Sequence, residues 1–172
     1  MQQKQVAILE SRMGAQLASL VAGRGGVPFL APALAELPDL DHQAIGALVR
    51  SLDKRPAKLA IFQTGVGTAA LLRDAEQRGR LADVLTAVAA STLVCRGPKP
   101  TAVVRRHGLE PTIIPQKPFT TKEILEALEP IELAGKAVAL VHYGERNIAL
   151  AEALRARGAR LAEACPYEWA LP

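Results

Sequence analysis

The chain has 172 residues, a formal net charge of +4, 49% hydrophobic residues and 3% aromatic residues. This composition excludes a disordered chain, because it supplies enough apolar side chains for a core. No stretch of about 18 residues is free of polar side chains, which argues against a membrane span. The apolar run at 6–9 is too short for a secretory signal. We therefore expect a cytoplasmic protein of one domain or slightly more.

The charged, aromatic and cysteine residues limit the kinds of ligand that this chain is expected to bind. Cys95 and Cys165 have no His or Cys nearby at metal-ligand spacing, so we expect buried free thiols and no metal. The positive charge is scattered, and only one Trp, two Tyr and three Phe accompany it. That is too few aromatic rings for a base-stacking surface, so no nucleic acid partner is expected. A basic balance also suits an anionic small molecule.

Apolar runs and helix-period segments alternate along the chain. The expected strands are 6–9, 27–30, 59–62, 92–95, 111–115, 137–141 and 160–165. The expected helices are 11–21 with Ser11 as N-cap, 42–52, 66–78, 81–89, 98–107, 120–128 and 147–157. The proline-containing segment 32–41 predicts a linker. Strands separated by helices of about ten residues predict an α/β fold with a parallel sheet covered on both faces.

The linker separates two unequal parts. Five strands follow it, which is enough for a complete three-layer domain. The two strands before it cannot form a core alone. We therefore expect one complete α/β unit and an incomplete βαβ piece of another.

Four loops follow the expected strands and precede helices. Ligands of open parallel sheets bind at this edge, beyond the carboxyl ends of the strands. The loops are 63–67, 96–100, 117–121 and 142–146. They combine small or hydroxyl residues with Gly or Pro, and three of them carry a cation. Because backbone amides at such turns bind carboxylates and phosphates, the loops predict an anion-binding rim.

The sequence of loop 63–67 also allows a different functional interpretation, namely dinucleotide binding. Gly65, Val66 and Gly67 match the start of the dinucleotide-binding pattern after a strand. The acidic residue that would bind a ribose is missing at the end of the next strand, where Arg96 could instead meet a 2′-phosphate. An NADP-binding oxidoreductase lobe is therefore an alternative. The sequence has no P-loop and no nucleophile elbow.

Several segments together resemble the uroporphyrinogen-III synthase family, particularly its bacterial branch. Their order and spacing match that family over nearly the whole chain, although each motif is short. The segments are 62–67, 96–99, 107–109, 120–125, 143–145 and 166–172.

The resemblance implies two Rossmann-like or flavodoxin-like lobes with a cleft between them. Residues 1–35 would then be a partial first lobe, made of a strand, a helix and a strand. Residues 36–166 would be the complete second α/β lobe, and residues 167–172 would return to the first lobe. The remainder of the first lobe would be absent, so we expect a truncated form of the family.

The implied activity is that of a hydro-lyase of haem biosynthesis. It converts hydroxymethylbilane into uroporphyrinogen III, with loss of water and inversion of one pyrrole ring. The substrate is a linear tetrapyrrole with eight carboxylates, no cofactor or metal is implied, and the complete protein would be a monomer. This chain alone is expected to be inactive. A non-catalytic, synthase-like regulatory domain is a further alternative.

The resemblance also implies the site residues. The cleft tyrosine of the family matches Tyr167, the candidate general acid, and its hydroxyl residue after the first strand of the second lobe matches Thr64. A second family hydroxyl falls at Pro100 here, with Thr101 one place later, and Arg12 matches a basic cleft position of some members. The other candidate substrate-binding residues are Gly65, Val66, Gly67, Gly97, Lys99, Thr120, Thr121, Tyr143 and Gly144.

Overall fold

The computed structural model describes residues 3–38, 46–48 and 59–172. The chain divides into two compact units. Unit 1 comprises Met1–Pro38 and Glu168–Pro172, and unit 2 comprises Asp39–Tyr167.

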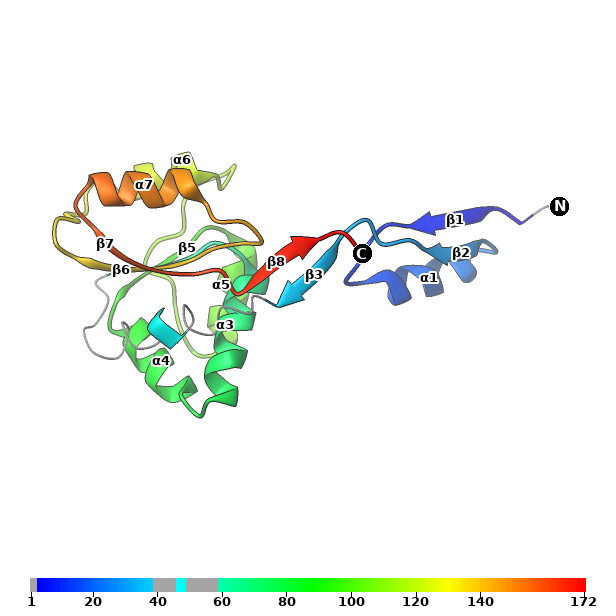
Figure 1. Ribbon diagram of the computed structural model, residues 1–172, viewed down its shortest axis with the longest axis horizontal. Helices are drawn as coiled ribbons and strands as arrows, with labels where there is room; N and C mark the ends of the chain where they lie inside the picture. The colour runs from blue at the N-terminus through cyan, green and yellow to red at the C-terminus, as the bar shows by residue number, and fades with distance from the viewer. Residues whose placement is uncertain (1–2, 39–45, 49–58) are drawn as a thin grey trace. The chain divides into compact units, whose positions relative to one another are not determined.

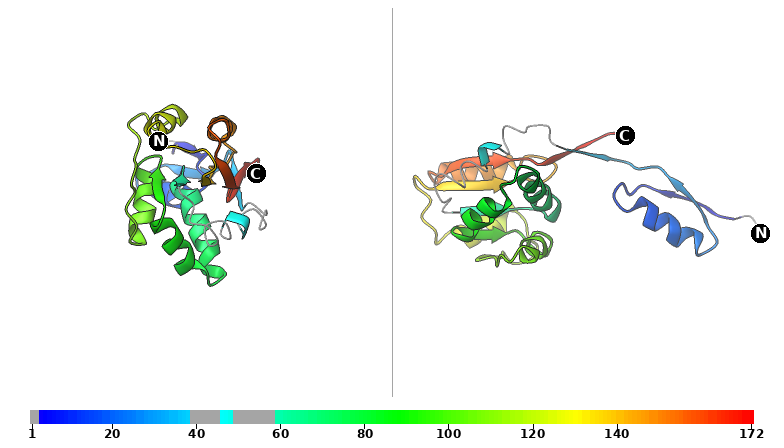
Figure 2. Two further views of the ribbon diagram at one scale, coloured as in Figure 1. Left: turned by 90° about the vertical axis from the view of Figure 1, so that its left-hand side faces the viewer. Right: turned by 90° about the horizontal axis from the view of Figure 1, so that it is seen from below.

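Unit 2 is built on one parallel sheet. Its strands are β4 (Leu59–Phe62), β5 (Thr92–Cys95), β6 (Ala137–Val141) and β7 (Arg160–Ala164), in the order β5-β4-β6-β7 (Figure 1). Its helices are α3 (Gly65–Gln77), α4 (Leu81–Ala89), α5 (Pro98–Arg106), α6 (Thr121–Leu128) and α7 (Ile148–Ala156). In the end-on view of Figure 2, α6 and α7 lie together on one face of this sheet. The predicted α/β fold with a parallel sheet is therefore confirmed.

The side chains of β4 explain why both sheet faces are covered. All four of its residues are buried, and successive residues of a strand point to opposite faces. Ala60 and Phe62 belong to the apolar cluster that contains residues of α3, α4 and α5. Leu59 and Ile61 belong to the cluster that contains residues of α6 and α7. A continuous apolar run is the pattern expected of a strand buried on both sides.

The helices that begin at the carboxyl edge of the sheet have well-defined starts. Thr64 caps α3 by accepting the N–H of Gly67 at 3.0 Å, and Asn147 caps α7 in the same way. Thr120 and Glu123 form a capping box at α6. The Thr120 hydroxyl and backbone N–H both hydrogen bond to the Glu123 carboxylate, which lowers the pKa of that group. These local signals fix where the loops of this edge end.

One predicted strand of unit 2 is not formed. Residues 111–115 make only an isolated bridge, in which the N–H of Cys95 donates to the carbonyl of Ile113 at 3.0 Å. Pro111 and Pro115 lack the N–H groups that a regular ladder needs, so pairing stops at this bridge. The sheet described therefore has four strands, not five. The expected helix 42–52 lies outside the described residues except for 46–48, which are helical.

Unit 1 contains β1 (Gln5–Ile8), α1 (Gly14–Ala22) and β2 (Val27–Leu30), and its two strands pair in parallel. Its helix begins later than predicted: the N-cap is Met13, without a side-chain cap, and not Ser11. The expected linker is also corrected in part, because β3 (Ala35–Pro38) is a strand. It pairs with β8 (Tyr167–Ala170) in a separate two-stranded sheet. No local sequence pattern predicts the pairing of β3 with β8, because the two strands are far apart in the sequence.

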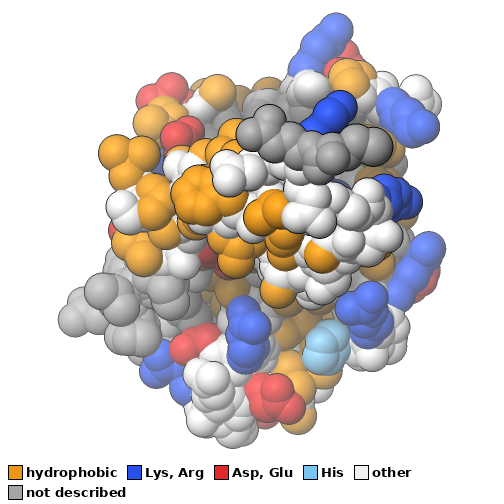
Figure 3. All heavy atoms as spheres, turned by 90° about the vertical axis from the view of Figure 1, so that its right-hand side faces the viewer, with side chains coloured by type: hydrophobic (Ala, Val, Ile, Leu, Met, Phe, Trp, Pro, Cys, Tyr) orange, Lys and Arg blue, Asp and Glu red, His pale blue; other side chains and the backbone are white. Residues whose placement is uncertain are grey.

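Many large apolar side chains of unit 1 are exposed. Two strands and one helix cannot bury both faces of their own sheet. Hydrophobic side chains are prominent on the molecular face drawn in Figure 3. The exposed apolar residues of this unit include Val6, Leu9, Met13, Leu17, Leu20, Val27, Phe29, Leu30, Leu34 and Leu37. Among the described residues, no helix combines the length and apolar character needed to cross a membrane.

Candidate functional site

The four loops singled out in the sequence touch one another at the carboxyl edge of the sheet. A Cβ atom placed on Gly65 would lie 3.0 Å from the backbone oxygen of Lys99, so loops 63–67 and 96–100 are in direct contact. A Cβ atom on Gly97 would lie 3.2 Å from the ring of Phe119, which joins loop 96–100 to loop 117–121. A side chain at either position would have to displace the neighbouring loop by a few tenths of an ångström, so glycine allows the close approach of these loops.

Gly67 makes the contact with the loop after β6. A Cβ atom on Gly67 would lie 2.7 Å from the carbonyl oxygen of His142 and 3.6 Å from Cε1 of Tyr167. The first turn of α3 is thus packed against the end of β6 and against the candidate general acid. Tyr167 itself is 4% exposed. The structure therefore brings Gly65, Gly67 and Tyr167 together in unit 2.

A buried hydrogen-bond network lies beneath these loops. The Asn147 side-chain amide donates to Gln63 Oε1 at 2.9 Å and to the Thr121 hydroxyl at 2.8 Å. The Gln63 amide lies 3.3 Å from Nδ1 of His142, and the Asn147 backbone N–H donates to the same nitrogen at 3.1 Å. Gln63, His142 and Asn147 are all buried. The network ties the ends of β4 and β6 to the starts of α6 and α7.

These partners define the tautomer of His142. Because Nδ1 accepts a backbone N–H, the ring proton of the neutral imidazole is on Nε2, which donates to Glu163 Oε2 at 2.9 Å. Burial lowers the pKa of His142, and the nearby carboxylate of Glu163 only partly opposes this effect. Arg155 forms an ion pair with the same carboxylate at the surface. His142 is therefore held as a neutral structural residue.

A cation lies above an aromatic ring at the same edge. The guanidinium carbon of Arg96, which follows β5, is 4.9 Å from the ring centroid of Tyr143, which follows β6. Both side chains are partly buried. The next residue, Gly144, has a φ of 34°, a conformation that favours glycine and sets the turn after Tyr143.

The hydroxyl residues expected at the site are largely engaged in caps. Thr64 and Thr120 accept backbone N–H groups at the starts of α3 and α6, and Thr121 accepts the Asn147 amide. Thr101 is 4% exposed, and its hydroxyl donates to the carbonyl of Gly97 at 2.9 Å. The hydroxyl of Thr101 is thus held against the backbone of its own helix. Val66 is partly buried, and Lys99 is exposed.

Arg12 belongs to unit 1. It forms an ion pair with Glu36, and its guanidinium carbon lies 4.6 Å from the ring centroid of Trp169. These contacts connect the segment after β1 with β3 and β8, the two strands of the second sheet of unit 1. They give Arg12 a structural role within that unit.

The residue patterns did not single out every polar residue at this edge. Gln63 and Asn147 were not selected as site residues, and Arg96 was considered only as a possible 2′-phosphate ligand, although each stands next to a strand end or a helix start. Arg96 carried a usable signal, since a cation directly after a strand of a parallel sheet lies at the ligand-binding edge. Gln63 and Asn147 carried none, because their partnership joins residues that are distant in sequence.

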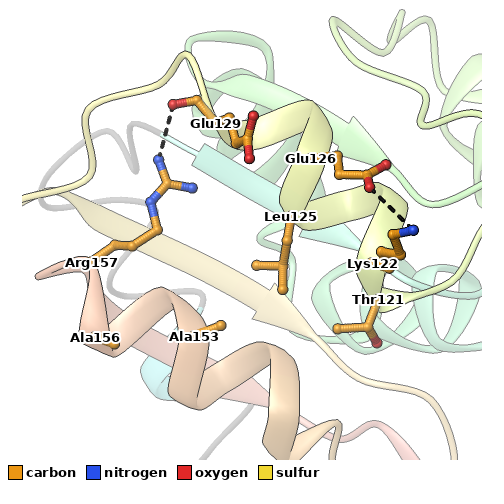
Figure 4. Close-up of a pocket in the computed structure, with 8 residues that line it drawn as sticks. All are labelled: Thr121, Lys122, Leu125, Glu126, Glu129, Ala153, Ala156 and Arg157. Carbon is orange, nitrogen blue, oxygen red and sulfur yellow. Dashed lines mark hydrogen bonds and ion pairs between the residues drawn. The ribbon is translucent and has the colours of Figure 1, made fainter.

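A separate groove runs between α6 and α7 (Figure 4). Its volume is about 750 Å³, and Leu125 and Ala153 point into it from the two helices. Lys122 pairs with Glu126 along α6 at 3.6 Å. The Arg157 guanidinium donates to the carbonyl of Leu128 at 3.0 Å, at the end of α6. The charged side chains at the groove are thus used for helix stability.

The cysteines and acidic residues give no metal centre in the described part of the chain. Within residues 3–38, 46–48 and 59–172, no three His, Cys, Asp or Glu side chains are grouped to hold a metal ion. Cys95 and Cys165 are buried thiols, as predicted. Burial raises the pKa of the Cys95 thiol to about 12, so this side chain stays protonated at neutral pH.

Three comparisons relate this chain to known proteins. The family model described as uroporphyrinogen-III synthase HemD matches residues 15–172. A crystal structure of a mutant uroporphyrinogen III synthase from Thermus thermophilus has a TM-score of 0.76 and 26% identity, covering 98% of this chain and 64% of that chain. The wild-type enzyme in another crystal form has a TM-score of 0.66 and 27% identity, covering 98% and 63% respectively.

A curated bacterial protein is also similar over almost the whole sequence. The uncharacterized protein YjjA of Bacillus subtilis (strain 168) is 29% identical over 165 residues, which cover 96% of this chain and 60% of that protein. The chain thus spans less than two thirds of the length of the relatives it matches. The family model covers far more than half of the sequence and agrees with the fold. The chain therefore belongs to the uroporphyrinogen-III synthase family.

Proposed function

We propose that this chain acts on a linear tetrapyrrole, as the second lobe of a uroporphyrinogen-III synthase. The reaction is the conversion of hydroxymethylbilane into uroporphyrinogen III, with loss of water and inversion of one pyrrole ring. One observation carries the proposal beyond family membership: the four loops predicted to form an anion-binding rim contact one another at one edge of the sheet. Such an edge suits a substrate with eight carboxylates.

The residues of this edge take distinct parts in the proposed reaction. The first backbone N–H groups of α3 have no partner within the helix and suit a carboxylate of the substrate. Tyr167 gives its phenolic proton to the departing hydroxyl, which leaves as water while the electron-rich pyrrole supplies the electrons. A proton is released again when the new carbon–carbon bond forms and the ring regains aromaticity. The protein contributes mainly by holding the chain in the folded geometry for closure.

Turnover by the 172-residue chain alone is proposed to be low. The synthase structures that resemble it are longer, because 98% of this chain matches them but covers only 64% and 63% of their lengths. We therefore propose that tetrapyrrole binding and catalytic turnover depend on different parts of the protein. Tetrapyrrole binding depends on residues present in unit 2, and efficient closure depends on more than unit 2.

The test is an assay with hydroxymethylbilane and the purified chain, with separation of the inverted and uninverted cyclic products. We expect saturable tetrapyrrole binding and only slow formation of the inverted product. Absence of binding would refute the substrate assignment. Rapid formation of uroporphyrinogen III would instead refute the proposal that this chain alone is a poor catalyst.

The two alternatives make other predictions. An NADP-binding lobe needs Gly65 and Gly67 to leave room for a pyrophosphate, yet backbone atoms of Lys99 and His142 occupy the space beside them. We therefore expect no thermal stabilisation by NADP(H), and a clear shift would favour the oxidoreductase reading. A regulatory domain would bind a small anion and release no product from hydroxymethylbilane at any enzyme concentration.

A further inference from the structure

Arg96 reaches across the end of a neighbouring strand. It follows β5 and contacts Tyr143, which follows β6, but these two strands are not neighbours, because β4 lies between them. Strands are about 4.8 Å apart, so roughly 10 Å separates β5 from β6. The contact between the two side chains therefore spans the carboxyl end of β4, where Thr64 starts α3. The backbone agrees with this placement, since the Arg96 N–H donates to the carbonyl of Phe62 at 2.9 Å.

Among the described residues, no carboxylate forms an ion pair with Arg96. In the part of the chain that the structure describes, the ion pairs between side chains involve other residues. A partly buried guanidinium ordinarily pairs with an anion, whereas Arg96 has the face of an aromatic ring. Contact with the ring face leaves the N–H groups at the edge of the guanidinium plane available for a bidentate bond to a carboxylate.

The first turn of α3 supplies a second source of positive potential at the same place. Thr64 satisfies the N–H of Gly67, and the helix dipole directs its positive end at this loop. Gly65 is in contact with Lys99 of the loop that carries Arg96. Two elements that are independent in sequence thus bring positive charge to the carboxyl edge of the sheet near the end of β4.

We propose that Arg96, oriented by Tyr143, is a carboxylate-binding residue of the substrate site. It takes one carboxylate of the linear tetrapyrrole between its guanidinium and the amino end of α3. The assignment of a tetrapyrrole carboxylate rests on the proposed function, whereas the carboxylate site itself can be tested independently. Tyr143 acts as a positioning residue, because its ring holds the guanidinium in place and need not touch the ligand.

The first experiment uses citrate as a simple carboxylate probe and observes arginine Nε–H and backbone N–H signals by NMR. We expect citrate to shift the signals of Arg96 and Gly65, with no comparable shift at Arg106, an exposed arginine at the far end of α5. The Gly65 shift should disappear in Arg96→Met. Shifts that are equal at Arg96 and Arg106, or absent at Arg96, would overturn the proposed site.

The second experiment measures binding of the eight-carboxylate tetrapyrrole to the full 172-residue chain at two salt concentrations. Arg96→Met should weaken binding roughly tenfold, the size expected for losing a hydrogen bond to a charged group, and should reduce its salt dependence. Arg106→Met is the matched control and should bind like the unmodified chain. Equal affinity of the two variants would overturn the role of Arg96.

Variants of the aromatic partner test positioning against a purely structural role. Tyr143→Phe keeps the ring and should bind the tetrapyrrole with normal affinity. Tyr143→Leu removes the ring and should weaken tetrapyrrole binding, as Arg96→Met does. The melting temperature of Tyr143→Phe should stay close to that of the unmodified chain, because the ring is kept. If Arg96→Met lowers the melting temperature but leaves affinity and salt dependence unchanged, the pair is only structural.

The two experiments separate the two hypotheses. If citrate shifts Arg96 but the tetrapyrrole does not bind, the substrate assignment fails and the carboxylate site stands. If the tetrapyrrole binds and Arg96→Met has no effect, the proposed function stands and the role of Arg96 is refuted.

Discussion

Gly67 lies so close to His142 that a Cβ atom at Gly67 would be 2.7 Å from the carbonyl oxygen of His142. Real Cβ atoms do not approach a backbone oxygen so closely, and neither residue can move easily. Gly67 is in the first turn of α3, and His142 continues β6 into its loop and is fully buried. The contact fixes the distance between two of the four loops, and much of the geometry of this edge depends on it.

Gly67→Ala is therefore expected to destabilise the protein by about 1–3 kcal/mol, the usual range for an overpacked site. Chemical denaturation of the purified variant measures this change. Ala82→Ser is a suitable control, because it also adds one heavy atom to a helix but at an exposed position. Its expected cost is a few tenths of a kcal/mol. A Gly67→Ala variant as stable as the control would contradict the close contact.

The stability of the fold should decrease in mild acid because of His142. Burial lowers the pKa of His142 below its ordinary value of 6.5, despite the neighbouring Glu163 carboxylate, and the charges of Arg146 and Arg155 act in the same direction as burial. Between pH 6.5 and the lowered pKa, the unfolded chain binds a proton that the folded chain does not. The free energy of unfolding therefore falls as the pH is lowered through this window, by at most about 1.4 kcal/mol per pH unit.

Urea denaturation at a series of pH values tests this linkage. His142→Asn should reduce the acid-side slope, and should also lower stability at neutral pH by about 1–3 kcal/mol because the buried network loses partners. Ala82→Ser, at an exposed position, provides a control that leaves every titratable group in place and should leave the slope unchanged. An unaltered slope in His142→Asn would show that another group titrates.

Both cysteines should resist thiol reagents in the folded protein. Cys95 and Cys165 are buried, and the pKa of the Cys95 thiol is raised to about 12, so very little thiolate is present at pH 8. We expect almost no reaction with a chromogenic disulfide reagent under native conditions. Two thiols per chain should react in guanidinium chloride. Rapid native labelling of one thiol would indicate local opening near that residue.

Tyr167→Phe should slow ring closure, by roughly 10- to 100-fold, if the phenol assists departure of the hydroxyl. This effect is at or below the lower end of the range for general acids, about 100- to 10,000-fold, because the pyrrole itself helps to expel the leaving group. Single-turnover measurements with the chain in excess over hydroxymethylbilane would detect even slow closure. Tyr143→Phe is the comparison and should have a smaller effect. A larger effect at Tyr143 would reject Tyr167 as the acid.

Much of unit 2 could be predicted from the sequence because its signals are local. Four strands were predicted from apolar runs, and helix starts from residues such as Pro98 and Thr120. The same reasoning failed where a strand depends on its partner. Residues 111–115 have a strand-like composition but form one bridge, whereas 35–38 read as a linker and pair with β8.

The features of the candidate site also fall into two groups: those that local sequence patterns predict and those that depend on the tertiary structure. The sequence by itself determined the family, the α/β class and which four loops lie at the carboxyl edge, because each follows from patterns within a few tens of residues. Only the tertiary structure decided that Gly67 must accommodate His142, that Asn147 joins Gln63 to Thr121, and that Arg96 spans β4 to reach Tyr143. These relationships depend on the order β5-β4-β6-β7, which brings together residues far apart in the chain. Strand order is set by packing of the whole sheet, so no local pattern encodes it.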